Sequence, residues 1–158
     1  MGHHPARLVK ARRRGALIRV DLTGTEVDLL AAMLDDFGLL LEEPDPADPV
    51  IQRLYPDGYT DDDEASEEYR GLVESDLRTE RSARLQACRA ELPEGAGRLE
   101  LDAEAADRWL RVLNDLRLAL GTRLEITDDN ELDETDPSVN IYSWLTAVQD
   151  TLILNVME

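Results

Sequence analysis

Residues 108–123, RWLRVLNDLRLALGTR, would place apolar side chains on almost every face of a helix. A helix that is apolar nearly all round is normally buried on several sides. Asp102 is positioned to cap its start, because the carboxylate can accept hydrogen bonds from the exposed amides of the first turn. Gly121 is expected to end the helix in a left-handed conformation. The sequence therefore predicts a central core helix.

The same helix carries three polar residues, Asn114, Asp115 and Arg117, among mostly apolar neighbours. If they are buried, each needs a hydrogen-bond or charge partner, because an unpaired buried polar group costs about 1 to 3 kcal/mol. A structural network that ties helices together is the favoured interpretation. A polar binding or catalytic site beneath the helices is the alternative.

Short alternating segments predict a small amount of β-structure. Residues 16–22 alternate apolar and charged side chains at the period of a half-buried strand, and with residues 7–11 they predict an N-terminal β-hairpin. Its turn is expected at residues 12–15. Residues 99–101 alternate in the same way and could pair with the hairpin.

Further helices are predicted at residues 25–42, 60–92 and 139–156, with a short helical turn at 49–55. Thr23 and Glu26 form a capping box at the start of the first of these. The second would span roughly 45 Å at 1.5 Å per residue, so a bend or break is expected near Gly71 or residues 75–79. The predicted fold is mainly α, a single four-helix domain over residues 1–158 with a small N-terminal β-hairpin and a mobile terminus at residues 1–6.

Length and charge limit the classes of function. A chain of 158 residues suits one domain with a real core. The net charge of -18 opposes binding to nucleic acid or to an anionic membrane. Cations cluster within residues 7–19, where they could contact phosphate or the acidic body of the protein. Direct DNA binding is expected to be weak. Because no run of 18 apolar residues occurs, a cytoplasmic location without membrane association is expected.

No residue pattern typical of a catalytic or metal site is found. Acids crowd residues 57–68 and 125–136, but neither cluster has the ligand order of an EF-hand. There is no Ser or Cys with a plausible His base, no glycine-rich phosphate loop and no zinc-ligand spacing. We therefore expect no catalytic residue, metal or cofactor. Cys88 lies near Arg84 and Arg89, and cations can lower the pKa of a thiol. A cysteine without a role is the favoured interpretation, and a redox residue is the alternative.

Several segments together resemble a known family. They are RVDLTGTEVDLL, DPVIQRLYPDGYTDDDEASEEYRGLVESDLR, RWLRVLNDLRLALGTRLEI and IYSWLTAVQDTLI, in this order along the chain. They are similar to the actinobacterial domain-of-unknown-function family whose genes lie beside that for the ClpS protease adaptor. The resemblance covers residues 16–154. Its most specific segments are residues 53–62, containing Arg53, Tyr55, Tyr59, Asp61 and Asp62, and residues 113–123.

The resemblance implies a cytosolic, mainly helical protein and supplies no catalytic residue. Some members of the family are described as oxidation-sensing transcriptional regulators that use a pair of nearby cysteines. This chain has a single cysteine, Cys88. A redox role would therefore need a bond between two subunits of a homodimer, or an adduct with a small thiol.

We predict a non-enzymatic regulatory or adaptor protein that acts through a protein partner. By resemblance, the partner belongs to the transcription or protease machinery, with links to transcription regulation, oxidative stress or Clp proteolysis. The residues assigned to a structural or interaction motif are Arg53, Tyr55, Tyr59, Asp61, Asp62, Asn114, Asp115 and Arg117. The alternative is an enzyme of unrecognised type with a polar site around Asn114, Asp115 and Arg117.

Overall fold

A computed structural model describes residues 10–55, 64–125 and 135–157, with residues 64–74 described as helix backbone only. The strands are β1 (Lys10–Arg14), β2 (Leu17–Leu22) and β3 (Gly97–Leu101). The helices are α1 (Gly24–Glu42), α2 (Pro49–Leu54), α3 (Glu64–Glu91), α4 (Ala103–Arg123) and α5 (Pro137–Val156). The chain is mainly helical, as predicted. These residues contain five helices and not four, because the predicted helical turn at residues 49–55 is the separate helix α2.

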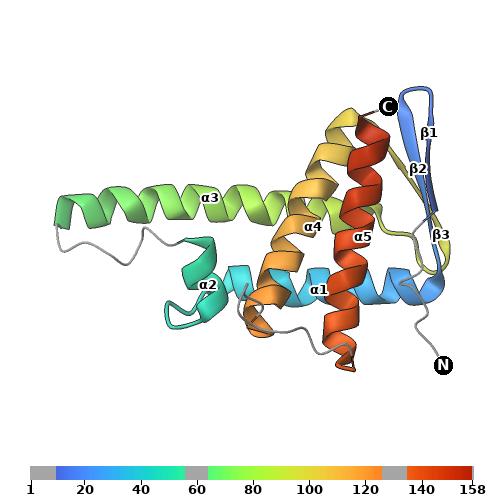
Figure 1. The fold of residues 1–158 in the computed structure, drawn as a ribbon. Helices are drawn as coiled ribbons and strands as arrows, with labels where there is room; N and C mark the ends of the chain where they lie inside the picture. The colour runs from blue at the N-terminus through green and yellow to red at the C-terminus, as the bar shows by residue number, and fades with distance from the viewer. Residues whose placement is uncertain (1–9, 56–63, 126–134, 158) are drawn as a thin grey trace.

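The helices form two layers (Figure 1). Helices α1 and α3 pack against each other in one layer, and α4 and α5 lie side by side across them in the other. The sheet covers one end of the second layer, where β1 and β2 contact α5 and β3 contacts α4. No helix in the described residues is long and apolar enough to span a lipid bilayer.

Helix α4 is the central helix, as the sequence predicted. Its Trp109, Val112, Leu113 and Leu116 are at most 3% exposed, and the helix contacts α1, α2, α3, α5 and β3. Asp102 caps its start, since the carboxylate accepts from the Ala105 amide at 2.8 Å. Residues from both layers and from the sheet therefore meet in one hydrophobic core around α4.

The expected end of α4 was wrong. Gly121 is buried inside the helix, which continues to Arg123, and the left-handed residue in this region is Glu125, with φ 54°. A Cβ atom at Gly121 would lie 3.1 Å from Cε2 of Tyr142 on α5. The glycine therefore allows a tyrosine ring to approach the α4 backbone closely.

The sheet has the order β1-β2-β3 with antiparallel pairing, so the segment at 99–101 does pair with the hairpin. The first strand ends later than predicted, at Arg14 and not at Ala11. Residues 12–14 lie in β1, and the turn falls at residues 15–16, where Gly15 has φ 59°. Glycine adopts this conformation without steric cost, which explains why the turn forms there and not among the arginines.

The predicted cap of α1 is confirmed, but the predicted break in α3 is wrong. The capping box of α1 is confirmed: Thr23 Oγ1 accepts from the Glu26 amide at 3.2 Å, and the Thr23 amide donates to Glu26 Oε1 at 2.9 Å. The break expected in α3 was wrong, because α3 is one continuous helix of 28 residues. Its N-terminal part extends beyond the other helices (Figure 1), so the helix does not have to fit within the width of the body.

Candidate functional site

Arg81 of α3 and Asp115 of α4 form an ion pair between these two helices. Arg81 Nε donates to Asp115 Oδ2 at 3.1 Å, and the side chains are only 19% and 11% exposed. The guanidinium also lies over the ring of Tyr55, which follows α2, at 5.2 Å from the ring centroid, where cation–π attraction is favourable. Burial raises the pKa of Asp115 even though Arg81 opposes the shift. These three residues join α2, α3 and α4 in the manner of a structural network.

A second polar cluster lies further along the α3–α4 interface. Arg108 of α4 is hydrogen-bonded to Glu91 of α3, and Trp109 Nε1 donates to the other Glu91 oxygen at 3.0 Å. Cys88, one turn before Glu91, is completely buried. Glu91 therefore ties the end of α3 to the start of α4.

The surroundings of Cys88 oppose ionisation of its thiol. Burial, and then the Glu91 carboxylate, raise the pKa of Cys88 to about 12, against the opposing effect of Arg108 and Arg84. Arg89 pairs instead with Asp35 of α1, with 2.9 Å between Nε and Oδ1. Desolvation therefore outweighs the effect of the nearby cations on this thiol. The thiol is protonated at neutral pH and is a poor nucleophile.

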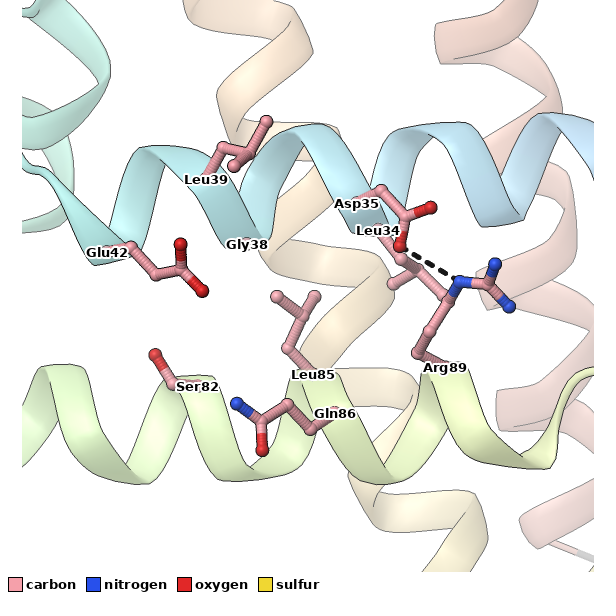
Figure 2. Close-up of a pocket in the computed structure, with 9 residues that line it drawn as sticks. All are labelled: Leu34, Asp35, Gly38, Leu39, Glu42, Ser82, Leu85, Gln86 and Arg89. Atoms are coloured by element: carbon pink, nitrogen blue, oxygen red, sulfur yellow. Dashed lines mark hydrogen bonds and ion pairs between the residues drawn. The ribbon is translucent and has the colours of Figure 1, made fainter.

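A groove of about 370 Å³ lies between α1 and α3 (Figure 2). Leu85 of α3 points toward α1 opposite Gly38, where a Cβ atom would be 3.4 Å from Leu85 Cδ2. The absence of a side chain at Gly38 therefore leaves room above Leu85. The Asp35–Arg89 ion pair closes one end of the groove.

The other end of the groove is open and continues along α3. Glu42, Ser82 and Gln86 line both this groove and a second hollow of about 370 Å³, which reaches Arg78 and Thr79. We call the two hollows together the α1–α3 groove. Its lining residues are Leu34, Asp35, Gly38, Leu39, Leu41, Glu42, Arg78, Thr79, Ser82, Ala83, Leu85, Gln86 and Arg89. Its charged side chains are acidic on α1 and basic on α3.

A separate pocket of about 470 Å³ lies where α2, α4 and α5 meet, which we call the α2–α4–α5 pocket. Helix α4 supplies residues three or four apart, which share one helix face. The pocket is lined by Arg53, Asn114, Arg117, Leu118, Gly121, Thr122, Glu125 and Tyr142. The side chains of Arg53 and Arg117 make no hydrogen bond or ion pair among the residues that the structure describes.

The structure divides the predicted motif residues between two places. Arg53, Asn114 and Arg117 line the α2–α4–α5 pocket, while Tyr55 and Asp115 lie in the cluster with Arg81. The predicted joint site of Asn114, Asp115 and Arg117 is therefore not formed, because Asp115 is on a different face of α4. Tyr59, Asp61 and Asp62 fall outside the described residues.

Three residues of these sites were not predicted from the sequence, namely Arg81, Tyr142 and Gly38. Arg81 lies in a run of alternating basic and acidic residues that looks like a solvated helix face. Tyr142 reaches the pocket only because α5 packs on α4, which no local pattern indicates. The groove residue Gly38 carried a usable signal, since a glycine inside a predicted helix often marks a packing site or a gap.

The basic residues from Lys10 to Arg14 belong to β1, and Arg7 falls outside the described residues. Lys10, Arg12 and Arg14 are exposed, on the strand face opposite to Ala11, which packs against the core. Arg13 donates through Nη1 to the carbonyls of Asn155 and Val156 at 3.2 and 3.4 Å, at the end of α5 where the helix dipole favours a cation.

Comparison with known proteins places the chain in a family. The profile of a domain of unknown function, DUF2017, matches residues 6–156. The chain belongs to the DUF2017 family. No solved structure matches the chain.

Curated relatives of this DUF2017 chain are found in mycobacteria. A protein of Mycobacterium leprae is 36% identical over 132 residues, and proteins of Mycobacterium bovis and Mycobacterium tuberculosis are 35% identical over 130 residues. The last two are named oxidative stress regulator AosR. Each match covers 71% of this chain and 60% of the relative. The chain therefore spans about 60% of the length of these relatives.

Proposed function

We propose that this DUF2017 chain is a non-enzymatic regulatory protein of the cytoplasm that acts by binding a partner protein. The names of the mycobacterial relatives support a regulatory role in the response to oxidative stress. The observation that carries the proposal is the α1–α3 groove, which continues along a helix that extends beyond the body of the molecule. We propose a component of the transcription or protease machinery as the partner class.

The chemistry of the groove favours one kind of ligand, an amphipathic helix of the partner. Leu34 and Leu85 line the floor of the groove and are only 1% and 5% exposed. Leu39, on the α1 rim, is the exposed apolar side chain of the groove, at 65%. Glu42 and Arg78 line opposite walls and have no ion-pair partner among the described residues. A helix with an apolar stripe, a cation facing α1 and an acid facing α3 would complement both walls.

Three observations weigh against the competing class, an enzyme. Asp115 is paired with Arg81 and lies outside the α2–α4–α5 pocket, so its carboxylate is not available as a base there. The Thr122 hydroxyl in the pocket donates to the Leu118 carbonyl at 2.8 Å and not to a base. Cys88 is buried and protonated. These features support a binding role over catalysis.

The proposal is tested by capturing a partner protein and then measuring whether a variant of the groove binds it more weakly. The full chain is immobilised, exposed to an actinobacterial lysate at moderate salt, and the captured proteins are identified by mass spectrometry. The candidate is then purified and its Kd is measured with the wild type, Leu39→Asp and Leu154→Asp. Leu154 is a matched control, because it is 64% exposed on α5, away from the groove.

We expect Leu39→Asp to raise the Kd at least tenfold and Leu154→Asp to leave it unchanged. Equal affinity of both variants would contradict docking in the groove. Failure to capture any transcription or protease component would contradict the proposed partner class. Capture of a second copy of the chain alone would replace the partner proposal with a homodimer.

A further inference from the structure

We propose that the α2–α4–α5 pocket binds a small organic anion, a phosphate monoester or a carboxylate, whose charged group is held between Arg53 and Arg117. The inference does not depend on the proposed protein partner, because the pocket lies on a different set of helices from the α1–α3 groove. It concerns a second, small-molecule binding function of the same chain.

The first line of evidence is the pairing of arginines on α4. Arg108 is bonded to Glu91, Arg111 pairs with Asp107 at 2.9 Å, and Arg123 pairs with Asp48 at 2.8 Å. Arg117 is the remaining arginine of this helix, and within the described residues it has no carboxylate partner. It is also the one that lines the pocket.

The second guanidinium comes from another element. Arg53 lies in the last turn of α2, lines the same pocket, and is likewise unpaired among the described residues. In a chain with net charge -18, this pocket therefore brings together two guanidinium groups from different helices without a carboxylate partner among the described residues. Guanidinium groups bind carboxylate and phosphate through two parallel hydrogen bonds.

The remaining lining residues suit an organic ligand. Asn114 adds an amide with both donor and acceptor atoms. Thr122 donates its hydroxyl hydrogen to the Leu118 carbonyl at 2.8 Å, so its oxygen remains able to accept a hydrogen bond. Leu118 and the Tyr142 ring, which lies close to Gly121, give the pocket an apolar wall.

The size of the pocket limits the class of ligand. A volume of about 470 Å³ lies within the range of small-molecule sites. The fitting class is a small anion with a flat or apolar body.

The experiment is an NMR titration of the full, isotope-labelled chain with defined probes. Phenyl phosphate, benzoate, inorganic phosphate and uncharged benzyl alcohol are added separately, and amide shifts are followed to saturation. We expect saturable shifts at residues 114–122 and at Tyr142 with phenyl phosphate, benzoate or both, and weaker binding of the other two probes. The tighter of the two organic anions identifies phosphate or carboxylate as the natural charged group.

Matched variants decide whether the two arginines bind the anion. Arg53→Gln and Arg117→Gln should each weaken binding at least tenfold. Arg111→Gln should not, although it removes the same charge from the same helix. Thermal unfolding of each variant confirms that it is folded, and Arg117→Lys should restore part of the affinity.

Three results would overturn the proposal. One is the absence of saturable shifts with all probes. Another is equal loss of affinity in Arg117→Gln and Arg111→Gln, which would indicate a nonspecific charge effect. The third is equal affinity for inorganic phosphate and phenyl phosphate, which would show that the pocket does not recognise an organic body.

Discussion

Burial of the Cys88 thiol determines the pH range in which it ionises. Its pKa is raised from 9.0 to about 12 in the folded chain, first by desolvation and then by Glu91. As pH rises above 9, the unfolded state loses this proton before the folded state does. The contribution of the thiol to the free energy of unfolding is therefore complete below pH 9 and is lost between about pH 9 and 12.

The comparison of wild type with Cys88→Ser measures this contribution. We expect the free energy of unfolding in urea to fall more steeply from pH 8 to pH 10.5 in the wild type than in the variant, because only the wild type carries the titrating thiol. Other groups titrate in both proteins and cancel. Parallel pH profiles would show that the thiol is not shielded in the folded chain.

Two glycines within helices should respond differently to alanine. Gly38→Ala places a methyl group 3.4 Å from the end of Leu85, an ordinary contact, so the gain in helix propensity should raise the free energy of unfolding by about 0.5 to 1 kcal/mol. Gly121→Ala meets the Tyr142 ring at 3.1 Å and should gain less, or lose stability. Urea unfolding of both variants tests this order, and a larger gain for Gly121→Ala would contradict the close packing of Tyr142.

At the scale of elements, the Arg81–Asp115 pair connects α3 to α4 and, through Tyr55, to α2. Asp115→Leu leaves Arg81 without its carboxylate in a largely buried site, which we expect to cost about 3 kcal/mol. The double variant Arg81→Met with Asp115→Leu removes both charges and should recover most of this loss. A double variant as unstable as Asp115→Leu alone would show that the pair is not coupled.

The helices were predicted largely from local signals. Apolar spacing and side-chain caps at Thr23 and Asp102 act over a few residues, so they could be read from the sequence. The continuous course of α3 could not, because it depends on whether the helix must fit inside the body. The position of Gly121 inside α4 depends on the ring of Tyr142, a residue of another helix.

The candidate sites were less predictable than the helices. Arg53 was singled out by family resemblance, and Asn114 and Arg117 as polar residues on an apolar helix. Their convergence at one pocket nevertheless requires α2 and α5 to pack on α4. Asp115 was grouped with them because it is adjacent in sequence, although neighbouring residues on a helix point in different directions. The α1–α3 groove depends on a glycine of one helix lying opposite a leucine of another.

At the scale of the whole molecule, net charge opposes binding to duplex DNA. The exposed Lys10, Arg12 and Arg14 of β1 could neutralise only a few phosphates, while the acidic body repels the duplex over about 8 Å at physiological salt. We expect only weak binding in gel shifts near 150 mM salt. Tight, sequence-selective binding that is lost in Arg12→Gln with Arg14→Gln would show that the basic strand outweighs the acidic body.

The central claim is that a partner protein docks in the α1–α3 groove. Hydrogen–deuterium exchange of the full chain, with and without the purified partner, tests this claim most directly. We expect slower exchange in residues 33–42 of α1 and 77–90 of α3, and no slowing when Leu39→Asp is used at the same concentrations. Protection confined to β1–β3 or to the α2–α4–α5 pocket, or equal protection of the Leu39→Asp variant, would contradict the account.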